Sequence, residues 1–374
     1  MADKQQGCDL TNRKRDEMNK RKTKVGILFG GKSGEHEVSF CSASAIIEAI
    51  DKEKYEAIPI GITIDGYWLS PKESQIVLKT GKIAGSDKTG FSFLTGLDVI
   101  FPALHGPYGE DGTVQGLLEL IGIPYVGSGV AASSIAMDKD LMKKIFQQAA
   151  LTQTKWKTIK RKRWNLEKKK ILDEIGNQLT YPLFIKPTNL GSSVGINKVF
   201  KKEELETAID TAASYDRKVI IEEGVENAIE VECSILGNDD PEFSIVGEIQ
   251  PGGEYYDYNS KYIDKNTKLI IPARIAEDVA EEVQKISKLA FLAIDAAGLA
   301  RVDFFIQKRT DSYQVLLNEI NTIPGFTRVS MYPKLWEKSG IGFSELVDRL
   351  IKLALERYQD KMTNKTEYPS GILQ

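Results

Sequence analysis

Two apolar segments near the C-terminus constrain the fold of this chain more than any other feature. Residues 299–306 and 313–321 both have the composition of core strands, with Val302 and Ile320 among their apolar positions. The connection between them, 307–312, is short enough for a hairpin, so the two strands are predicted to pair antiparallel. Any fold of this chain must therefore bury an antiparallel strand pair.

Polar side chains on this strand pair indicate a metal site. Alternate residues of a strand share a face, so Arg301 and Asp303 lie together, as do Glu319 and Asn321 on the partner strand. Three hard oxygen donors are what Mg²⁺ takes when nucleotide phosphates supply its remaining ligands. A surface cluster of salt bridges is the alternative interpretation, but carboxylates on core strands are costly unless they have partners.

The N-terminal part of the chain alternates strands with helices. A short buried strand is predicted over 25–29, where two glycines stop it, with further strands over 55–64 and 97–104. Helices are expected over 38–49 and 113–121. This alternation predicts a parallel sheet with helical cover.

The middle of the chain shows a similar mixture. Strands are expected over 181–187 and 218–222, with a helix over 201–213 between them, and a longer helix over 277–297. With 374 residues the chain is too long for one ordinary domain, so two or three domains are expected.

Composition limits the classes of function. Hydrophobic residues make up 41% and charged residues 28%, which is typical of a soluble globular protein. No segment has the ~18 apolar residues of a membrane span, and the net charge of −3 gives no general attraction to nucleic acid or to a membrane. Residues 1–23 lack the apolar core of a secretory signal and are predicted to be a flexible extension. Three cysteines form no framework, which suits the cytosol.

Two glycine-containing loops are candidate ligand sites. Lys186 lies near the end of a strand, and the loop 191–195 that follows has small residues whose backbone N–H groups are suited to a phosphate. An ordinary Gly/Ser turn is the alternative. Gly325 follows Pro324 in a tight turn, which together with Arg301 is suited to a substrate carboxylate.

Three other patterns point to no function. Residues 26–33 match the P-loop motif, but the residues that should form its loop are the predicted strand itself. The segment 155–170 holds nine Lys/Arg residues and two tryptophans, and a solvated strand and helix start is favoured there over a nucleic-acid site. His36 and His105 sit in no zinc spacing. The residues by themselves indicate an enzyme that binds a magnesium nucleotide between domains and acts on a small carboxylate.

In their order, these residues resemble the D-alanine–D-alanine ligases of the ATP-grasp superfamily, from residue 24 to about residue 357. The motifs that carry the likeness are Phe29-Gly-Gly-Lys-Ser-Gly-Glu-His-Glu-Val-Ser39, Leu104-His-Gly106, Gly109-Glu-Asp-Gly112, Met137-Asp-Lys139, Gly191-Ser-Ser-Val-Gly195, Tyr256-Asp-Tyr258, Lys261-Tyr262, Arg301-Val-Asp303 and Asn318-Glu-Ile-Asn-Thr-Ile-Pro-Gly-Phe326. Each motif alone is weakly specific, and their order and spacing make the likeness specific.

The resemblance implies an α/β and α+β ATP-grasp fold. A Rossmann-like parallel α/β domain over 24–137 would be followed by a central subdomain over 138–225 and a C-terminal subdomain over 226–360, both α+β with largely antiparallel sheets. Residues 1–23 and 361–374 would be tails.

The resemblance also assigns residues to the nucleotide, the metal and the substrates. Those implied to bind ATP are Lys139, Lys186, Ser193, Glu222, Glu223, Val225, Glu230 and Lys261, with the two lysines Lys139 and Lys186 and then Lys261 on its phosphates. Those implied to hold two Mg²⁺, which Mn²⁺ can replace, are Asp303, Glu319 and Asn321. Those implied to act on or bind the two D-alanines are Glu35, Ser192, Tyr262, Arg301, His105, Gly325, Ser330 and Met331.

The implied reaction joins two D-alanines through a D-alanyl phosphate and releases ADP and phosphate, for peptidoglycan precursors. The implied protein is a cytoplasmic homodimer without nucleic-acid or membrane partners. Ligases of D-alanine to D-lactate or D-serine are the nearest alternatives. Tyr262 stands where D-lactate enzymes carry a lid histidine, and Met331 resembles the D-alanine enzymes. A non-catalytic nucleotide sensor is disfavoured because the metal-binding residues are all present.

Overall fold

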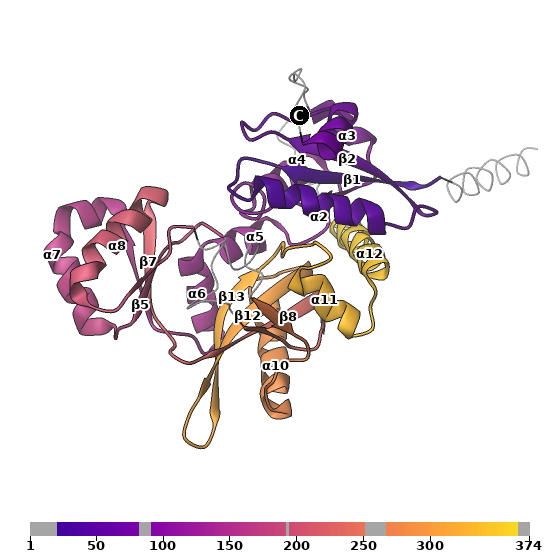
Figure 1. The fold of residues 1–374 in the computed structure, drawn as a ribbon. Helices are drawn as coiled ribbons and strands as arrows, with labels where there is room; N and C mark the ends of the chain where they lie inside the picture. The colour runs from indigo at the N-terminus through magenta and orange to yellow at the C-terminus, as the bar shows by residue number, and fades with distance from the viewer. Residues whose placement is uncertain (1–20, 82–90, 192–193, 251–266, 366–374) are drawn as a thin grey trace, which may run out of the picture.

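The computed structural model describes residues 21–81, 91–191, 194–250 and 267–365, which form three sheets (Figure 1). The first sheet is parallel, as predicted from the alternation of strands and helices, and its strand order is β2-β1-β3. Its strands are β1 (Thr23–Gly30), β2 (Tyr55–Ile62) and β3 (Val99–Pro102). The helices of this region are α2 (His36–Ala49), α3 (Pro71–Thr80), the 3₁₀ helix η1 (Phe91–Gly96) and α4 (Thr113–Ile121).

Strand β1 decides two sequence-based interpretations. It begins at Thr23, which pairs with Tyr55, so the sheet starts one residue before the predicted boundary at 24. Ile27 lies within the strand and is fully buried, and a Cβ on Gly26 would lie 2.7 Å from the Ile100 side chain. Residues 26–33 therefore start inside a sheet core and form no P-loop.

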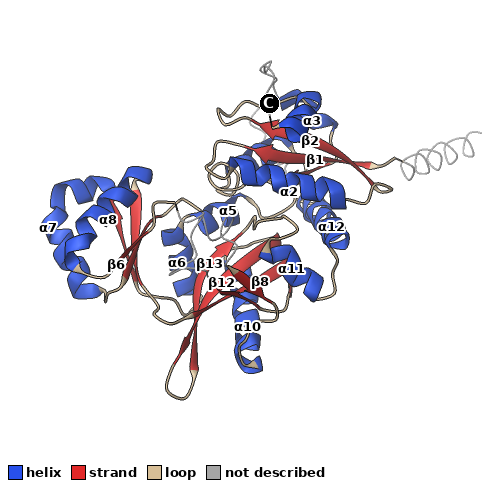
Figure 2. Ribbon diagram, viewed as in Figure 1, coloured by secondary structure: helices blue, strands red, loops and turns tan. Residues whose placement is uncertain are grey.

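The central sheet is antiparallel, with the order β4-β7-β5-β6. Its strands are β4 (Trp156–Lys160), β5 (Leu183–Pro187), β6 (Asn197–Val199) and β7 (Lys218–Glu223), and its helices are α7 (Arg161–Gln178) and α8 (Lys202–Tyr215). Ile185, Ile221, Trp164 and Ile209 belong to one core that the sheet and these two helices enclose (Figure 2).

The basic run 155–170 is the strand β4 and the start of α7, as expected. Its lysines face acidic partners: Lys157 lies 2.9 Å from Glu174, and Lys168 lies 2.9 Å from Asp210. These ion pairs offset part of the charge of the run within the central subdomain.

The third sheet is also antiparallel and contains the predicted hairpin. Its order is β11-β10-β8-β12-β13, with β9 beside β8. The strands are β8 (Ile229–Gly237), β9 (Glu242–Phe243), β10 (Gly247–Gln250), β11 (Lys268–Ile270), β12 (Gly298–Lys308) and β13 (Tyr313–Asn321). The helices around it are α5 (Val130–Met137), α6 (Lys139–Gln148), α10 (Glu277–Ala293) and α11 (Met331–Lys338), and the last described helix is α12 (Phe343–Lys361).

Packing joins segments that the predicted ranges 24–137, 138–225 and 226–360 separate. Met142 and Phe146 of α6 lie in one core with Val302 of the third sheet. Leu350 of α12 lies in one core with Val25 of β1. The chain thus returns to the first sheet after building the third. Among the helices of the described residues, none combines the length and the apolar character that a membrane span needs.

Candidate active site in the cleft between two sheets

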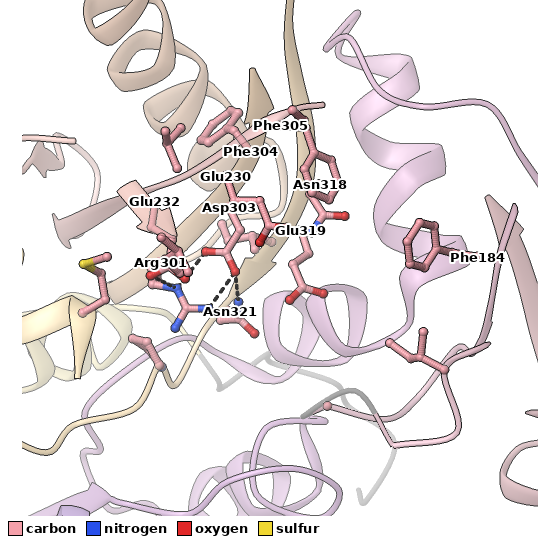
Figure 3. A pocket seen from close by; sticks show the side chains of 18 of the residues that line it. Phe184, Glu230, Glu232, Arg301, Asp303, Phe304, Phe305, Asn318, Glu319 and Asn321 are labelled. Atoms are coloured by element: carbon pink, nitrogen blue, oxygen red, sulfur yellow. Dashed lines mark hydrogen bonds and ion pairs between the residues drawn. The ribbon is translucent and has the colours of Figure 1, made fainter. Parts of the chain in front are cut away.

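A cleft of about 1180 Å³ lies between the central and third sheets and extends to the first. Figure 3 shows one wall of it, with carboxylates of β8, β12 and β13 side by side and Phe184 of the central sheet across from them. The residues on the two walls come from segments far apart in the sequence. The site therefore exists only in the folded chain.

The third sheet forms an acidic wall. Asp303 of β12 is in register with Glu232 of β8 on one side and with Glu319 of β13 on the other. Glu230 lies further along β8 and also faces the cleft. The register shifts by one residue between Phe304, which pairs with Leu317, and Asp303, which pairs with Glu319, so this bulge brings Glu319 opposite Asp303. The hairpin and its shared face are as the sequence predicted.

Arg301 is the counter-charge at the centre of this wall. Its guanidinium donates to both Asp303 oxygens, at 2.7 and 2.6 Å, and lies 2.9 Å from Glu232. The Asn321 amide donates to Asp303 at 3.2 Å. One guanidinium thus joins two carboxylates that would otherwise repel each other in a buried place.

The chemistry of this donor set fits a divalent cation. Asp303 and Glu319 are hard oxygen donors on neighbouring strands, and Asn321 adds an amide beside them. Within the described residues no three His, Cys, Asp or Glu side chains form a metal cluster by themselves. The predicted set has two carboxylates, so phosphate or water oxygens must complete the coordination.

The central sheet forms a wall that carries cations. Lys186 of β5 lies 2.5 Å from one Glu222 oxygen, and Lys143 of α6 lies 2.8 Å from the other. Burial works against the charged form of Glu222, but the attraction of the two lysines prevails and lowers its pKa to about 2. Burial likewise opposes the charge on Lys186, yet Glu222 raises its pKa.

Helix α6 connects the two walls. Asp138 caps its first turn by accepting from the backbone N–H groups of Asp140 and Leu141 at 3.1 and 3.2 Å. This places the Lys139 ammonium 2.9 Å from the Leu190 carbonyl and 3.6 Å from Glu319. Lys139 therefore stands between the loop at 191–195 and the acidic wall.

Glu35 and His105 lie at the end of the cleft formed by the first sheet. Both are buried, and a Cβ on Gly191 would lie 3.2 Å from a Glu35 oxygen, so Gly191 lies close to this glutamate. The His105 ring lies 3.5 Å from Glu110 and 2.9 Å from the Ser42 hydroxyl. Burial lowers the pKa of His105, but Glu110 outweighs it and the pKa is raised.

The Pro-Gly turn after β13 borders the same cleft. A Cβ on Gly325 would lie 3.0 Å from the Ser330 hydroxyl. That hydroxyl accepts from the Thr327 backbone N–H at 3.1 Å. Met331 also borders the cleft and is buried in a small cluster with Leu335.

Most residues that the sequence predicted are brought together here. Those that line the cleft are Glu35, His105, Lys139, Lys186, Glu222, Glu223, Val225, Glu230, Arg301, Asp303, Glu319, Asn321, Gly325, Ser330 and Met331. The Glu223 carboxylate accepts from the Thr180 backbone N–H at 2.9 Å, so its side chain has a structural partner. Ser192, Ser193, Lys261 and Tyr262 lie outside the described residues.

Sequence reasoning missed several residues of the site. Lys143 pairs with Glu222, and Glu232 pairs with Arg301. Glu248 and Arg274 line the cleft and form a further ion pair on the acidic side. A signal existed for Lys143, because it lies between Met142 and Phe146 on the apolar side of a helix. Phe184 also lines the cleft, and nothing in its local sequence indicates a ligand site.

This arrangement, a parallel domain followed by two antiparallel sheets with a cleft between them, is the ATP-grasp fold. Family sequence models described as the D-ala D-ala ligase N-terminus and C-terminus match residues 24–128 and 145–352. The chain belongs to the D-alanine–D-alanine ligase family. Proteins of this family use ATP, D-alanine and a divalent metal ion.

Relatives called D-alanine--D-alanine ligase match nearly the whole chain. The protein from Natranaerobius thermophilus is 48% identical, over 93% of this chain and 99% of its own length. The protein from Geobacillus thermodenitrificans is 46% identical, over 91% of this chain and 97% of its own length.

Solved structures agree with the fold. The VanG D-Ala:D-Ser ligase from Enterococcus faecalis has a TM-score of 0.77 and 37% identity, covering 89% of this chain and all of that structure's chain. The D-alanine-D-alanine ligase from Coxiella burnetii has the same TM-score and 33% identity, covering 91% of this chain and 96% of its own.

Proposed function

We propose that this chain joins two D-alanines into D-alanyl-D-alanine, and that ATP is converted to ADP and phosphate in the reaction. The observation that carries the proposal is the pairing of a lysine-bearing wall with a carboxylate-bearing wall, with Glu35 at the end of the cleft they form. Such a cleft suits a nucleotide whose phosphates lie between cations on one side and a metal on the other.

The nucleotide would lie along the central sheet. Glu222, with Glu223 and the backbone at Val225, would face the adenine, and Glu230 would accept from the ribose. Lys139 and Lys186, with Ser193 of the glycine loop, would contact the phosphates. The position of Lys139 between Leu190 and Glu319 supports this role, because a cation there can approach both phosphate and metal.

Asp303, Glu319 and Asn321 would hold two Mg²⁺, for which Mn²⁺ can substitute. The ions offset negative charge on the phosphates when they are bound. Arg301 donates to both Asp303 oxygens here. If a cation binds Asp303 instead, Arg301 can still pair with Glu232.

The first D-alanine would sit beside Glu35, which would hold its ammonium group, with His105 near its carboxylate. One carboxylate oxygen attacks the γ-phosphorus of ATP, the bond to the bridging oxygen of ADP breaks, and D-alanyl phosphate forms. A free carboxylate is a poor acyl donor, so this step creates the leaving group that the amide bond requires.

The second D-alanine would be held by Arg301, the Gly325 backbone N–H and Ser330, with Met331 beneath. Its deprotonated amine attacks the acyl carbon, phosphate leaves, and the amide bond forms. Arg301 and the Gly325 N–H would stabilise the oxyanion of the tetrahedral intermediate. The proximity of Ser330 to Gly325 supports a shared binding pocket.

Ser192, Lys261 and Tyr262 keep the roles that the resemblance implied. Ser192 and Tyr262 would orient Glu35, and Lys261 would reach the γ-phosphate. The proximity of Gly191 to Glu35 supports the first of these roles, because Ser192 follows Gly191 in the chain. A cytoplasmic homodimer that supplies peptidoglycan precursors is also part of the proposal.

The test is ADP release with D-alanine, D-serine and D-lactate as second substrates, measured side by side with product chromatography. We expect the highest kcat/KM with D-alanine and a product of two D-alanines. D-serine is the alternative that a specific observation favours, because one solved relative is a D-Ala:D-Ser ligase. A preference for D-serine would change the proposed substrate, and no amino-acid-dependent ADP release would refute the proposed reaction.

A further inference from the structure

Lys143 is a charged residue whose side chain is buried. Its side chain is 1% exposed, and it ranks with phenylalanines and tryptophans among the largest fully buried side chains. Burial lowers its pKa. An ammonium in such a place is costly unless it has specific partners, so its partners indicate what it does.

Two of those partners belong to the cleft itself. The Lys143 ammonium is 2.8 Å from Glu222, donates to the Thr154 hydroxyl at 3.2 Å, and lies 5.5 Å from the centre of the Trp156 ring. Glu222 and Thr154 line the cleft, but Lys143 does not. Lys143 therefore reaches the cleft through Glu222 and Thr154, and of these two Glu222 is the charged one.

The two oxygens of Glu222 have different partners. Lys143 holds Oε1, and Lys186 holds Oε2. Lys186 itself lines the cleft and is proposed to contact phosphate, which would take its ammonium away from Oε2. Lys143 has no such alternative, because its side chain is 1% exposed and does not line the cleft.

We infer that Lys143 is a positioning residue that keeps Glu222 ionised and oriented, so that its Oε2 accepts from the 6-amino group of adenine. The inference rests on the proposed function, and it assigns base selectivity to a residue outside the cleft. An ionised carboxylate accepts hydrogen bonds and cannot donate them. The pocket would therefore favour a purine that presents a donor at position 6.

The test compares ATP with purine riboside triphosphate, which lacks only the 6-amino group, in D-alanine-dependent ADP release. For Lys143→Met, which keeps the length and removes the charge, we expect the ATP preference in kcat/KM to fall about tenfold. Most of the loss should lie in the KM for ATP rather than in kcat. Lys143→Arg should retain most of the preference.

Lys144→Met is the matched control. Lys144 is the next residue on α6, its side chain is 58% exposed, and it pairs with Asp140 at 2.9 Å. The ATP preference of Lys144→Met should equal that of the parent. An equal loss in both variants, or an unchanged preference in a folded Lys143→Met, would overturn the inference.

Two further outcomes separate this inference from the proposed function. If the parent releases ADP with D-alanine and prefers ATP, but Lys143→Met keeps that preference, only the role of Lys143 is wrong. If the parent shows no amino-acid-dependent ADP release or no preference, the proposed function or its adenine site is wrong, and the inference falls with it. If Lys143→Met does not fold, the same preference is measured in Lys143→Gln.

Discussion

The two walls of the cleft are both antiparallel sheets, yet their charged groups differ, because the central sheet brings lysines to the cleft beside Glu222 and Glu223, and the third sheet brings carboxylates around Arg301. The central sheet carries Lys186 and Lys198 towards the cleft, whereas the third sheet carries Asp303 and Glu319. The lysines of the central sheet attract a nucleotide phosphate directly. The carboxylates of the third sheet can hold it only through a metal ion. The difference in charge, rather than in fold, therefore decides what each sheet can bind.

The walls also differ in how they are built. The central sheet encloses its own core with α7 and α8. The third sheet shares its core with α5 and α6, which come before the central sheet in the chain. Helix α6 therefore belongs to the acidic wall by its packing and reaches the cationic wall with Lys143.

The largest effect is expected on the acidic wall. Glu319→Gln keeps the shape of the side chain and removes one of two carboxylate charges at the proposed metal site. ADP release with D-alanine should fall by about 100-fold or more, since a bound metal contributes several kcal/mol to charge stabilisation. Asp311→Asn, at the exposed tip of the same hairpin, is the control. Turnover within a few-fold of the parent would refute the metal assignment.

The corresponding change on the cationic wall should have a smaller effect on a different parameter. Lys186→Met should raise the KM for ATP about tenfold, because one charge-assisted contact to phosphate is lost. Lys202→Met changes an exposed lysine of the same subdomain, which pairs with Asp173, and should leave the KM unchanged. Equal KM values for the parent and Lys186→Met would show that Lys186 serves Glu222 alone.

The pH dependence of stability tests the Glu222 network on the cationic wall. Because the folded-state pKa of Glu222 is about 2, below its ordinary value of 4.5, its stabilisation is complete above pH 4.5 and is lost as the pH falls towards 2. The free energy of unfolding, measured with urea at pH 7 and pH 3, should fall by about 2 kcal/mol less in Glu222→Gln than in the parent. Parallel pH curves would contradict the lowered pKa.

The smallest effect is expected where the cation is exposed. Glu248 on the acidic side is buried, but its partner Arg274 has a side chain that is 60% exposed, and the Arg274 backbone N–H also donates to Glu248 at 3.0 Å. In urea unfolding, Arg274→Met should lower the free energy of unfolding by the smallest amount of these changes, because water screens an exposed ion pair. A loss as large as that of a buried pair, ~3 kcal/mol, would show that exposure does not weaken this contact.

The acidic wall was predictable because its geometry is local. Arg301 and Asp303 are two residues apart on one strand, as are Glu319 and Asn321 on the next, and a short hairpin joins the two strands. The register set at the turn would pair Asp303 with Asn318, so the bulge is the one feature of this wall that strand period and turn length do not predict. The period of a strand and the length of a turn are properties of the sequence itself. The parallel first sheet and the helix over 113–121 were predictable for the same reason.

The tertiary structure alone decided which wall faces which. Lys143 and Glu222 are far apart in the chain, and no periodicity relates them, so only the position of α6 beside the central sheet, where Asp140 also bonds to Thr158, brings them to 2.8 Å. Helix α12 likewise packs on the core of the first sheet because this buries its apolar side chains. Local patterns specify which face of an element is apolar or charged, and long-range burial selects the partner for that face.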